Sequence, residues 1–378
     1  MNKPKTIGIL GGGQLARMSA FAAKRMGFNV AILEKEKNSP AGQLTHLEFK
    51  GWVNDNNIMK RFASSSDVIT LENEFVDYRR IEFLENLGKK VYPSSRTISL
   101  IQDKLIQKET LQKNKIPVPR FTAVNHKSDF DKIVKELKLP FILKSRKMGY
   151  DGYGNAYVNS KKKFEAAFDK LTHRHSKLLA EEFVDFKMEL AVMVARTKRE
   201  IKTYPVVQTI QKNHICHTVI APARINPKIE KLAKEIAIES VLAVKGFGIF
   251  GVELFYTSKG KILVNEMAPR PHNSGHYTIE GCYTSQFENH IRSVLNLPLG
   301  STEMVQPYAV MINLLGKRNN SGVVRNYNTA LANDRVHLHI YGKHTSRIGR
   351  KMGHITVVGD DLNKILRIAK KADRDTII

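Results

Sequence analysis

Cysteines and long apolar runs are both scarce in this sequence of 378 residues. Cys216 and Cys282 are the only cysteines, and two thiols so far apart in so long a chain do not make a disulfide framework. The first residues hold only a short apolar run, 7–10, so we expect no secretory signal peptide. No later segment approaches the ~20 apolar residues that cross a membrane. The sequence therefore predicts a protein of the reducing cytoplasm with no membrane partner.

Acidic residues are also few, with 36 Asp and Glu against 61 Lys and Arg and a formal charge of +25. A surplus of this size raises nucleic-acid binding as a hypothesis. The lysines are, however, scattered over predicted helix faces such as 127–138 and 228–245, without a basic tail or an aromatic-interleaved RNA-binding signature. We therefore expect no specific nucleic-acid partner. A solvated basic surface is the favoured interpretation, and attraction of small anionic substrates is the alternative.

Alternating apolar and amphipathic segments divide the chain into three expected domains, 1–99, 100–297 and 298–378. The first has a doubly wound, Rossmann-like α/β pattern, with strands at 6–10, 30–33, 68–71 and 90–92 and helices at 14–26, 58–64 and 78–87. A helical stretch at 96–114 ends before two prolines, which we interpret as a hinge. The second domain reads as α+β, and the third as a small set of strands closed by a helix.

A glycine loop directly follows the first expected strand. Gly11, Gly13 and Ala16 fit the pattern G-x-G-x-x-A, and Glu34 ends the next strand as a candidate ribose partner. Such a loop is typical of NAD-binding proteins. Any ligand approached by backbone N–H groups at a helix N-terminus selects the same glycines, however, and so does a tight turn. This segment alone leaves a dinucleotide, another phosphorylated ligand and simple packing open.

Two glutamates lie in neighbouring strand-like runs, 248–256 and 261–267, joined by Lys259 and Gly260. If these two residues form a hairpin turn, Glu253 and Glu266 face each other across the ladder. Like charges in that position are destabilising unless a cation lies between them. Two carboxylates that leave other positions to phosphate oxygens are typical of magnesium sites. The alternative is a bulge that shifts the register and leaves two surface glutamates.

A second glycine loop, 149–154, follows a strand that carries Lys144. Three glycines in six residues allow main-chain N–H groups to fold over a phosphate chain. The loop opens no helix, because Asn155 begins another strand-like run. We therefore predict a flap over a nucleotide, with an ordinary β-hairpin as the alternative.

The order of these features resembles that of the ATP-grasp superfamily. The resemblance implies lysines that contact phosphates, a flap and an acidic segment around the nucleotide, a carboxylate on the ribose, and Mg²⁺, with Mn²⁺ as an alternative, held by Glu253 and Glu266. The matching nucleotide residues are Lys104, Lys144, Gly149, Tyr150, Asp151, Gly152, Tyr153, Gly154, Asn155, Glu181, Glu182, Phe183, Val184, Glu189, Gln211, Asn265 and Glu266. Two of them depart from the family pattern, since Tyr153 stands where a basic residue is usual and Gln211 where a histidine is usual.

Within the superfamily, the segment 265–276 resembles the signature of the N5-carboxyaminoimidazole ribonucleotide synthetase family. The opening 11–18, the acidic pair at 72 and 74, and the basic segments at 341–343 and 350–354 are also similar to that family. The resemblance implies an ATP-grasp ligase that carboxylates aminoimidazole ribonucleotide with bicarbonate through carboxyphosphate, and a homodimer. The alternatives are another ATP-grasp ligase, such as a formate-dependent glycinamide ribonucleotide transformylase, and an NAD-dependent oxidoreductase.

The same resemblance assigns residues to chemistry and to substrate binding. The implied catalytic residues are Arg270, His272, Asn273, Lys343, Glu72 and Tyr150. Arg270 offers a planar fork suited to a carboxylate, and Lys343 a point charge, where charge develops on phosphoryl and carboxyl oxygens. The implied contacts with the ribonucleotide are Gly13, Gln14, Leu15, Glu74, Arg350 and Lys351.

Overall fold

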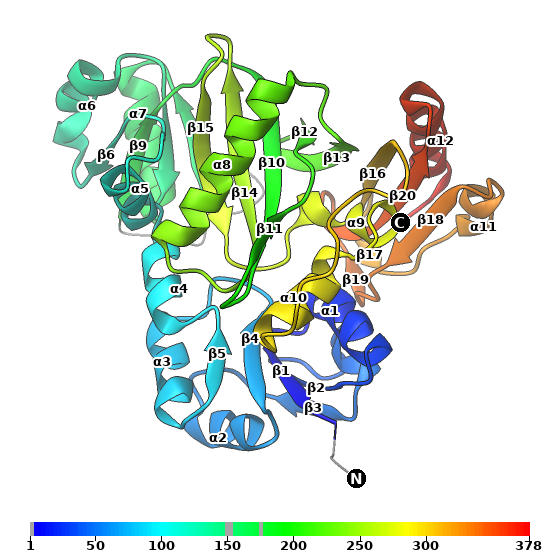
Figure 1. Ribbon diagram of the computed structural model, residues 1–378. Coiled ribbons are helices and arrows are strands. Elements are labelled where there is room, and N and C mark those ends of the chain that lie inside the picture. Colours follow the sequence, from blue (N-terminus) through cyan, green and yellow to red (C-terminus); the bar gives the residue numbers. More distant parts are fainter. Residues whose placement is uncertain (1–3, 148–153, 174–176) are drawn as a thin grey trace.

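The N-terminal part of the chain forms a parallel five-stranded sheet in the computed structural model, which describes residues 4–147, 154–173 and 177–378 (Figure 1). The strands, in spatial order, are β3 (Leu47–Lys50), β2 (Asn29–Glu34), β1 (Thr6–Leu10), β4 (Val68–Leu71) and β5 (Lys90–Tyr92). Every residue of β1 is buried, as expected for a parallel strand covered on both faces. The predicted doubly wound α/β pattern is confirmed, although β3 was not predicted.

Separate helices cover the two faces of this sheet. One face packs against α2 (Asn56–Ser64), α3 (Tyr78–Asn86) and α4 (Ser95–Ile101). The other face packs against α1 (Gln14–Arg25) and also against α10 (Gln286–Val294), a helix from far along the chain. The sheet therefore brings the first glycine loop close to the segment that resembles the family signature.

The predicted helix at 96–114 is wrong in one respect, because it is two helices. Helix α4 ends at Ile101, and α5 (Lys104–Lys113) begins two residues after the break. Asp103 causes the break: its carboxylate accepts a hydrogen bond from the N–H of Leu105 and pairs with the Arg146 guanidinium at 2.7 Å. The cap fixes the first turn of α5, on which Lys104 stands.

The remainder of the chain builds a smaller and a larger sheet. The four-stranded sheet has the order β6 (Phe121–Val124), β9 (Leu178–Glu182), β7 (Phe141–Ser145), β8 (Asn155–Val158), and it packs against α6 (Phe130–Leu137) and α7 (Lys161–Thr172). The large sheet has the order β15 (Ile262–Ala268), β14 (Gly248–Thr257), β10 (Phe186–Arg196), β12 (Val207–Lys212), β13 (Ile215–Ala221), β16 (Tyr308–Leu315), β20 (Lys351–Gly359), β18 (Val336–Ile340). Strand β11 (Ile201–Thr203) pairs with β10.

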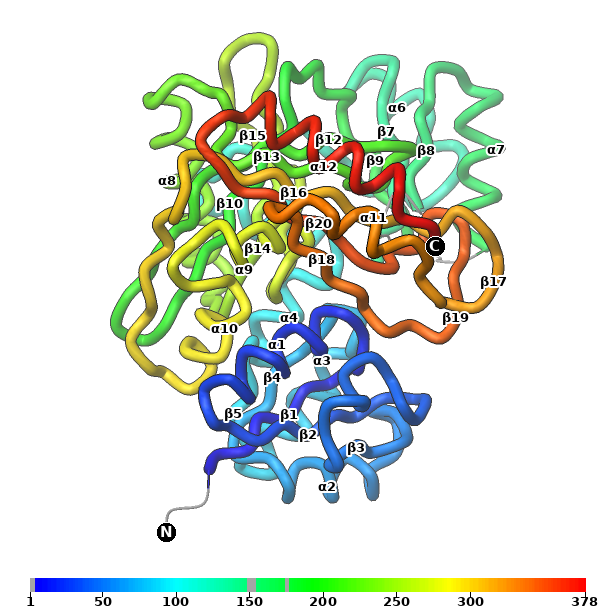
Figure 2. The backbone as a smooth tube through the Cα atoms, turned by 90° about the vertical axis from the view of Figure 1, so that its right-hand side faces the viewer, coloured from blue at the N-terminus to red at the C-terminus, as the bar shows by residue number. Residues whose placement is uncertain are grey.

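The large sheet continues across the expected domain boundary at residue 298, since β13 pairs with β16. Helix α8 (Pro227–Ala243) packs on the β10, β14 and β15 end, and α12 (Leu362–Asp375) packs on β16 and β20 (Figure 2). The remaining short elements are α9 (Thr278–Gly281), α11 (Tyr327–Leu331), β17 (Asn320–Ser321) and β19 (Thr345–Ser346). The expected second and third domains therefore share one hydrogen-bonded ladder.

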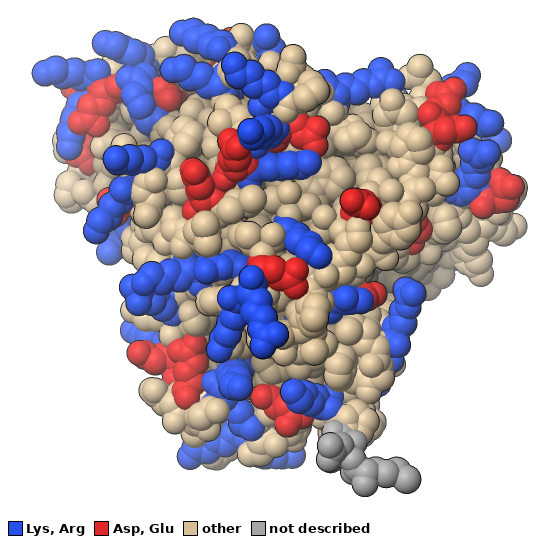
Figure 3. Space-filling view, viewed as in Figure 1, with Lys and Arg blue, Asp and Glu red and all other residues tan. Residues whose placement is uncertain are grey.

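Lys and Arg side chains are spread over the face in Figure 3, with Asp and Glu side chains between them. This distribution resembles the solvated surface favoured from the sequence more than one continuous basic patch. Among the described residues, none of the helices is both long enough and apolar enough to cross a bilayer.

The hairpin of β14 and β15 pairs Glu253 with Glu266, as predicted, but by a different route. The predicted two-residue turn is wrong: Tyr256 pairs with Ile262, one position short of the expected register. A bulge next to Glu253 inserts Asn265 as an extra residue and restores the pairing. The two departures cancel. The bulge that sequence analysis considered as an alternative is therefore the feature that sets the two carboxylates opposite each other.

Candidate active site

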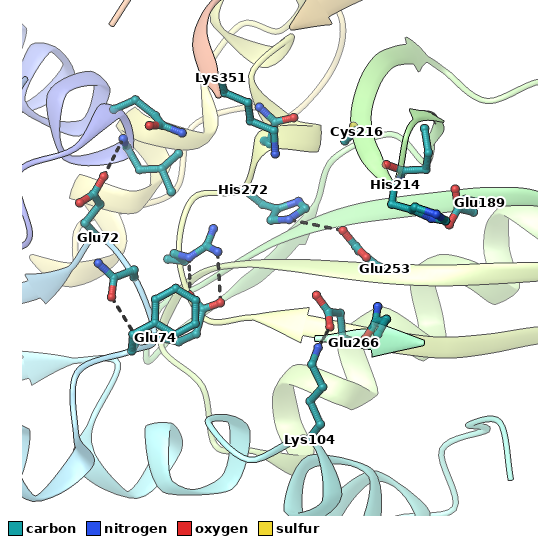
Figure 4. Close-up of a pocket in the computed structure, with 18 residues that line it drawn as sticks. Glu72, Glu74, Lys104, Glu189, His214, Cys216, Glu253, Glu266, His272 and Lys351 are labelled. Carbon is teal, nitrogen blue, oxygen red and sulfur yellow. Dashed lines mark hydrogen bonds and ion pairs between the residues drawn. The ribbon is translucent and has the colours of Figure 1, made fainter. Parts of the chain in front are cut away.

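A cavity of about 380 Å³ opens between the N-terminal sheet and the large sheet (Figure 4). It brings together predicted residues from segments far apart in the sequence. They are Gln14, Leu15, Glu72, Glu74, Lys104, Asn155, Glu189, Gln211, Glu253, Glu266, Arg270, His272, Asn273 and Lys351. Asn73, Phe75, His214 and Cys216, which were not predicted, complete the lining.

The opposed glutamates of β14 and β15 both point into this cavity (Figure 4). Lys104 forms an ion pair with Glu266, and the His272 Nε2 atom lies 3.5 Å from Glu253 Oε1. The described residues contain no group of three or more His, Cys, Asp or Glu side chains placed to hold a metal. Two carboxylates with room beside them fit Mg²⁺ that takes its other ligands from phosphate and water.

The bulged residue Asn265 makes its contacts on the same side as Glu266. Its Nδ2 lies 3.4 Å from Glu253 Oε2, and its Oδ1 accepts a hydrogen bond of 3.3 Å from Lys144. Successive residues of a regular strand point to opposite faces, so only the bulge allows both side chains to serve one site. Asn265 therefore links the carboxylate pair to the predicted phosphate lysine.

Behind the cavity, Glu181 is buried between two lysines. Its Oε1 lies 2.8 Å from Lys144 Nζ and its Oε2 lies 2.6 Å from Lys108 Nζ. Burial would raise the pKa of Glu181, but the two ammonium groups outweigh it and lower the pKa to about 2. Both oxygens of the Glu181 carboxylate are therefore paired with these lysines. Lys108 was missed, although its spacing of four residues from Lys104 on a predicted helix places both on one face.

Burial and repulsion also mark the predicted ribose residue, Glu189. Desolvation and the nearby charge of Glu253 raise its pKa to about 7, while a hydrogen bond with Gln211 acts in the opposite direction. The ionised carboxylate is therefore held in an unfavourable environment. Such a group is typical of a binding site, where a ligand supplies the missing hydrogen-bond donors.

Replacing Glu189 by glutamine is expected to raise the melting temperature at pH 8 by roughly 2 °C. A raised carboxyl pKa means that ionisation disfavours the fold, so the cost begins as pH rises above 4.5 and is complete above about 7. The gain should therefore be smaller at pH 5. Thermal unfolding at both pH values tests this, with the exposed Glu235→Gln as control. Equal shifts at both pH values would contradict the assigned cause.

The first glycine loop is occupied by the chain's own carboxylates. Glu34 Oε2 accepts a hydrogen bond from the N–H of Gly12, and Glu72 accepts from those of Gly13 and Leu15, at 2.8, 2.8 and 3.3 Å. Burial raises the pKa of Glu72, and the backbone hydrogen bonds partly offset this. The interpretation of Glu34 as a ribose partner is wrong, and a dinucleotide pyrophosphate would have to displace both carboxylates. Gln14 and Leu15 line the cavity and remain the predicted substrate contacts.

Arg270 is oriented by a carboxylate from the N-terminal sheet. Its Nε and Nη2 atoms lie 2.5 and 3.1 Å from the two oxygens of Glu74. Burial would raise the pKa of Glu74, but the charge of Arg270 and its hydrogen bonds outweigh it, so the pKa is lowered. The bidentate pair fixes the plane of the guanidinium at the cavity wall.

His272 lies beside two cationic side chains at the cavity wall. Burial, and then the charges of Arg270 and Lys351, hold its pKa well below the usual value. Its Nδ1 atom lies 2.8 Å from the Ser274 hydroxyl oxygen and 3.4 Å from the Ser274 backbone nitrogen, and its Nε2 atom is the one nearer to Glu253. The imidazole is therefore placed to form a hydrogen bond with an oxygen in the cavity.

The predicted residues that follow β18 are only partly in the cavity. Lys351 lines it, whereas Lys343 Nζ donates to the Lys351 carbonyl at 2.7 Å and Arg350 donates to the Thr345 carbonyl and hydroxyl. Asn273 exchanges hydrogen bonds with Asn313, a buried partner that gave no signal in the sequence. The lysine and arginine that lie outside the lining are held against the segment that carries Lys351.

Some of the predicted nucleotide-binding residues lie away from the cavity, and others lie outside the described residues. Glu182 pairs with Arg120, and the exposed Phe183 packs edge-on against Tyr157. Gly154 lies in the turn before β8 and Asn155 is the first residue of that strand, but the rest of the predicted flap, namely Gly149, Tyr150, Asp151, Gly152 and Tyr153, lies outside the described residues. The structure does not place Val184 in the cavity lining.

Three family models match successive parts of the chain. Residues 4–102 match the ribonucleotide synthetase preATP-grasp domain, residues 109–287 the ATP-grasp domain, and residues 309–368 the phosphoribosylaminoimidazole carboxylase C-terminal domain. These ranges include every residue of the cavity lining described above except Lys104.

Similar proteins are known over nearly the whole length. An N5-carboxyaminoimidazole ribonucleotide synthase of Bacillus subtilis is 40% identical, with 93% of this chain and 90% of that protein covered. The crystal structure of such a synthetase from Thermotoga maritima has a TM-score of 0.88 at 44% identity over 99% of both chains. An Aspergillus clavatus synthase in complex with ADP and 5-aminoimidazole ribonucleotide has a TM-score of 0.90 at 36% identity over 98% of both. The chain spans about two thirds of the length of fungal and plant phosphoribosylaminoimidazole carboxylases that it matches.

Proposed function

The chain belongs to the N5-carboxyaminoimidazole ribonucleotide synthase family of ATP-grasp ligases, and we propose on that premise that it carboxylates 5-aminoimidazole ribonucleotide in purine biosynthesis. The resemblance inferred from the sequence and its ATP-grasp architecture are thereby confirmed. The observation that carries the proposal is one cavity that holds the opposed Glu253 and Glu266 near the oriented Arg270.

The reaction has two steps. An oxygen of bicarbonate attacks the terminal phosphorus of ATP, the bond to the bridging oxygen breaks, and ADP leaves. The amine of the ribonucleotide then attacks the carboxyl carbon of carboxyphosphate, the C–O bond to the phosphoryl group breaks, and phosphate leaves with the electron pair and takes up the proton that the amine loses. Charge develops on phosphoryl oxygens first and on carboxyl oxygens next, so the protein must supply donors at both places.

The chain's own groups fit these needs. Lys104 and Lys144 supply ammonium groups near the carboxylate pair, and Mg²⁺ bound there would neutralise phosphate charge. Arg270, held by Glu74, presents a fixed guanidinium to a planar carboxylate. The His272 imidazole, whose Nε2 atom faces Glu253, is placed to orient an oxygen of the intermediate through a hydrogen bond.

Pure protein with ATP, Mg²⁺, bicarbonate and aminoimidazole ribonucleotide is expected to release ADP and phosphate faster than with any one component omitted. A coupled ADP assay measures the rate, and isotopic bicarbonate reports carboxylation. If formate with glycinamide ribonucleotide supports turnover instead, the ATP-grasp chemistry stands and the substrate assignment falls. If neither pair stimulates turnover, the proposal is wrong.

We propose three further properties. The metal is Mg²⁺, with Mn²⁺ as a substitute, on the basis of the all-oxygen donor pair Glu253 and Glu266. The assembly is a homodimer, as the family resemblance implied, and the compartment is the cytoplasm, as the cysteine content and the lack of a signal peptide in the sequence implied. Light scattering of the pure protein measures the assembly directly.

A further inference from the structure

Lys108 is a buried cation that the mechanism above does not use. It stands on α5 one turn after Lys104 and is 2% exposed. Its Nζ pairs with Glu181 and donates to the backbone carbonyl of Asn265 at 3.2 Å. A buried ion pair contributes little more to stability than an apolar pair of the same shape. Stability alone therefore does not explain why a lysine occupies this position.

The charges around Glu181 do not balance. The ammonium groups of Lys108 and Lys144 share the single ionised carboxylate of Glu181, so these three side chains together carry one net positive charge. Burial lowers the pKa of Lys108, and the charge of Glu181 opposes that shift. Without Lys108, Glu181 would neutralise Lys144 completely. Coulomb interactions are strong where water is excluded. Loss of the Lys108 charge would therefore weaken the attraction for the phosphates that Lys144 is proposed to bind.

Lys108 also anchors the bulge. Its hydrogen bond to the Asn265 carbonyl ties α5 to the extra residue of β15, and the Asn265 side chain connects Lys144 with Glu253. Lys108 thus contacts two groups. One is the backbone of Asn265, next to the proposed metal ligand Glu266, and the other is the carboxylate of Glu181, which pairs with Lys144.

We propose that Lys108 is a positioning residue for the ATP phosphates: it supplies the net charge that lets Lys144 bind phosphate oxygens, and it fixes the bulge that directs Asn265 and Glu266 to the metal. The inference rests on the proposed function only in taking ATP as the nucleotide. Lys108 acts through Lys144 and Asn265 and makes no contact with ATP itself.

Lys108→Met keeps the length of the side chain and removes its charge. We expect it to weaken binding of a non-hydrolysable ATP analogue with Mg²⁺ by about tenfold or more, because a charge-assisted contact is lost. Adenosine, which lacks phosphates, should bind within about twofold of the wild type. Lys108→Arg should retain most of the affinity for the analogue, and Lys231→Met, at an 80% exposed position, serves as the matched control. Calorimetry measures each affinity.

The double variant Lys108→Met with Glu181→Gln restores the net charge of the cluster and leaves no buried carboxylate short of a partner. Its ratio of adenosine to analogue dissociation constants should rise about threefold or more above that of Lys108→Met, and should stay below the wild-type ratio because the hydrogen bond to the bulge is still missing. A ratio as low as that of Lys108→Met would overturn the proposal, as would equal weakening of adenosine and analogue. The double variant keeps the test valid if Lys108→Met does not fold. Binding needs neither bicarbonate nor ribonucleotide, so failure of the proposed carboxylation would be seen separately.

Discussion

Glu266→Gln is expected to reduce Mg²⁺-dependent ATP turnover by about a thousandfold. The carboxylate is the proposed metal ligand on β15 and also the ion-pair partner of Lys104. The amide keeps the shape of the side chain but loses the charge that Mg²⁺ requires. Glu253→Gln should behave alike. Steady-state ADP release over a range of Mg²⁺ concentrations measures the loss.

The fold should survive this change, because the two facing carboxylates repel each other when no metal is bound. We expect a melting temperature without Mg²⁺ that is unchanged or slightly higher, and no further gain on adding Mg²⁺ with an ATP analogue. Glu235→Gln, on the exposed face of α8, should retain wild-type turnover. Full activity of Glu266→Gln at low Mg²⁺ would show that the metal lies elsewhere.

Arg270→Ala is expected to lower kcat for carboxylation by about a hundredfold or more, with affinity for ADP nearly unchanged. We propose that the guanidinium acts on charge that forms during the reaction and not on the bound nucleotide. Measurement of kcat with saturating ribonucleotide and bicarbonate, beside calorimetry with ADP, separates the two effects.

Glu74→Gln offers a sharper comparison, since it keeps the guanidinium and weakens only the group that orients it. We expect a smaller loss of kcat than in Arg270→Ala, because the side-chain oxygen of glutamine can still accept one of the two hydrogen bonds from the Arg270 guanidinium. Arg79→Ala, at a 71% exposed side chain, is the control. If Arg270→Ala lowers the affinity for ADP by as large a factor as it lowers kcat, Arg270 serves nucleotide binding instead.

The sequence predicted the N-terminal sheet well because its strands are short apolar runs between amphipathic helices, a local pattern. It failed at Asp103, where a cap and the distant Arg146 end a helix that local propensity would continue. Pairing of Glu253 with Glu266 was predicted, yet the cancelling turn and bulge were not. The bulged Asn265 is held by Lys108 on α5, a contact between segments far apart in the sequence.

The predicted site residues came together where their roles follow from charge and motif. The family resemblance did not predict that the Glu181 carboxylate pairs with Lys108, because such a contact depends on burial between α5 and β9. Nor did the glycine pattern distinguish a loop that binds a phosphate from one that binds Glu34 and Glu72. Backbone N–H groups accept either anion, and only the three-dimensional arrangement decides which is present.

The ladder shared by β13 and β16 sets limits on how the chain can be cut. A fragment ending near residue 298 would expose the open edge of β13, where Val219, Ile220 and Ala221 are now buried. Unpaired edges of this kind invite pairing between molecules and aggregation. The last eighty or so residues therefore cover an edge of the large sheet that would otherwise be open, and the two segments expected as separate domains share that sheet.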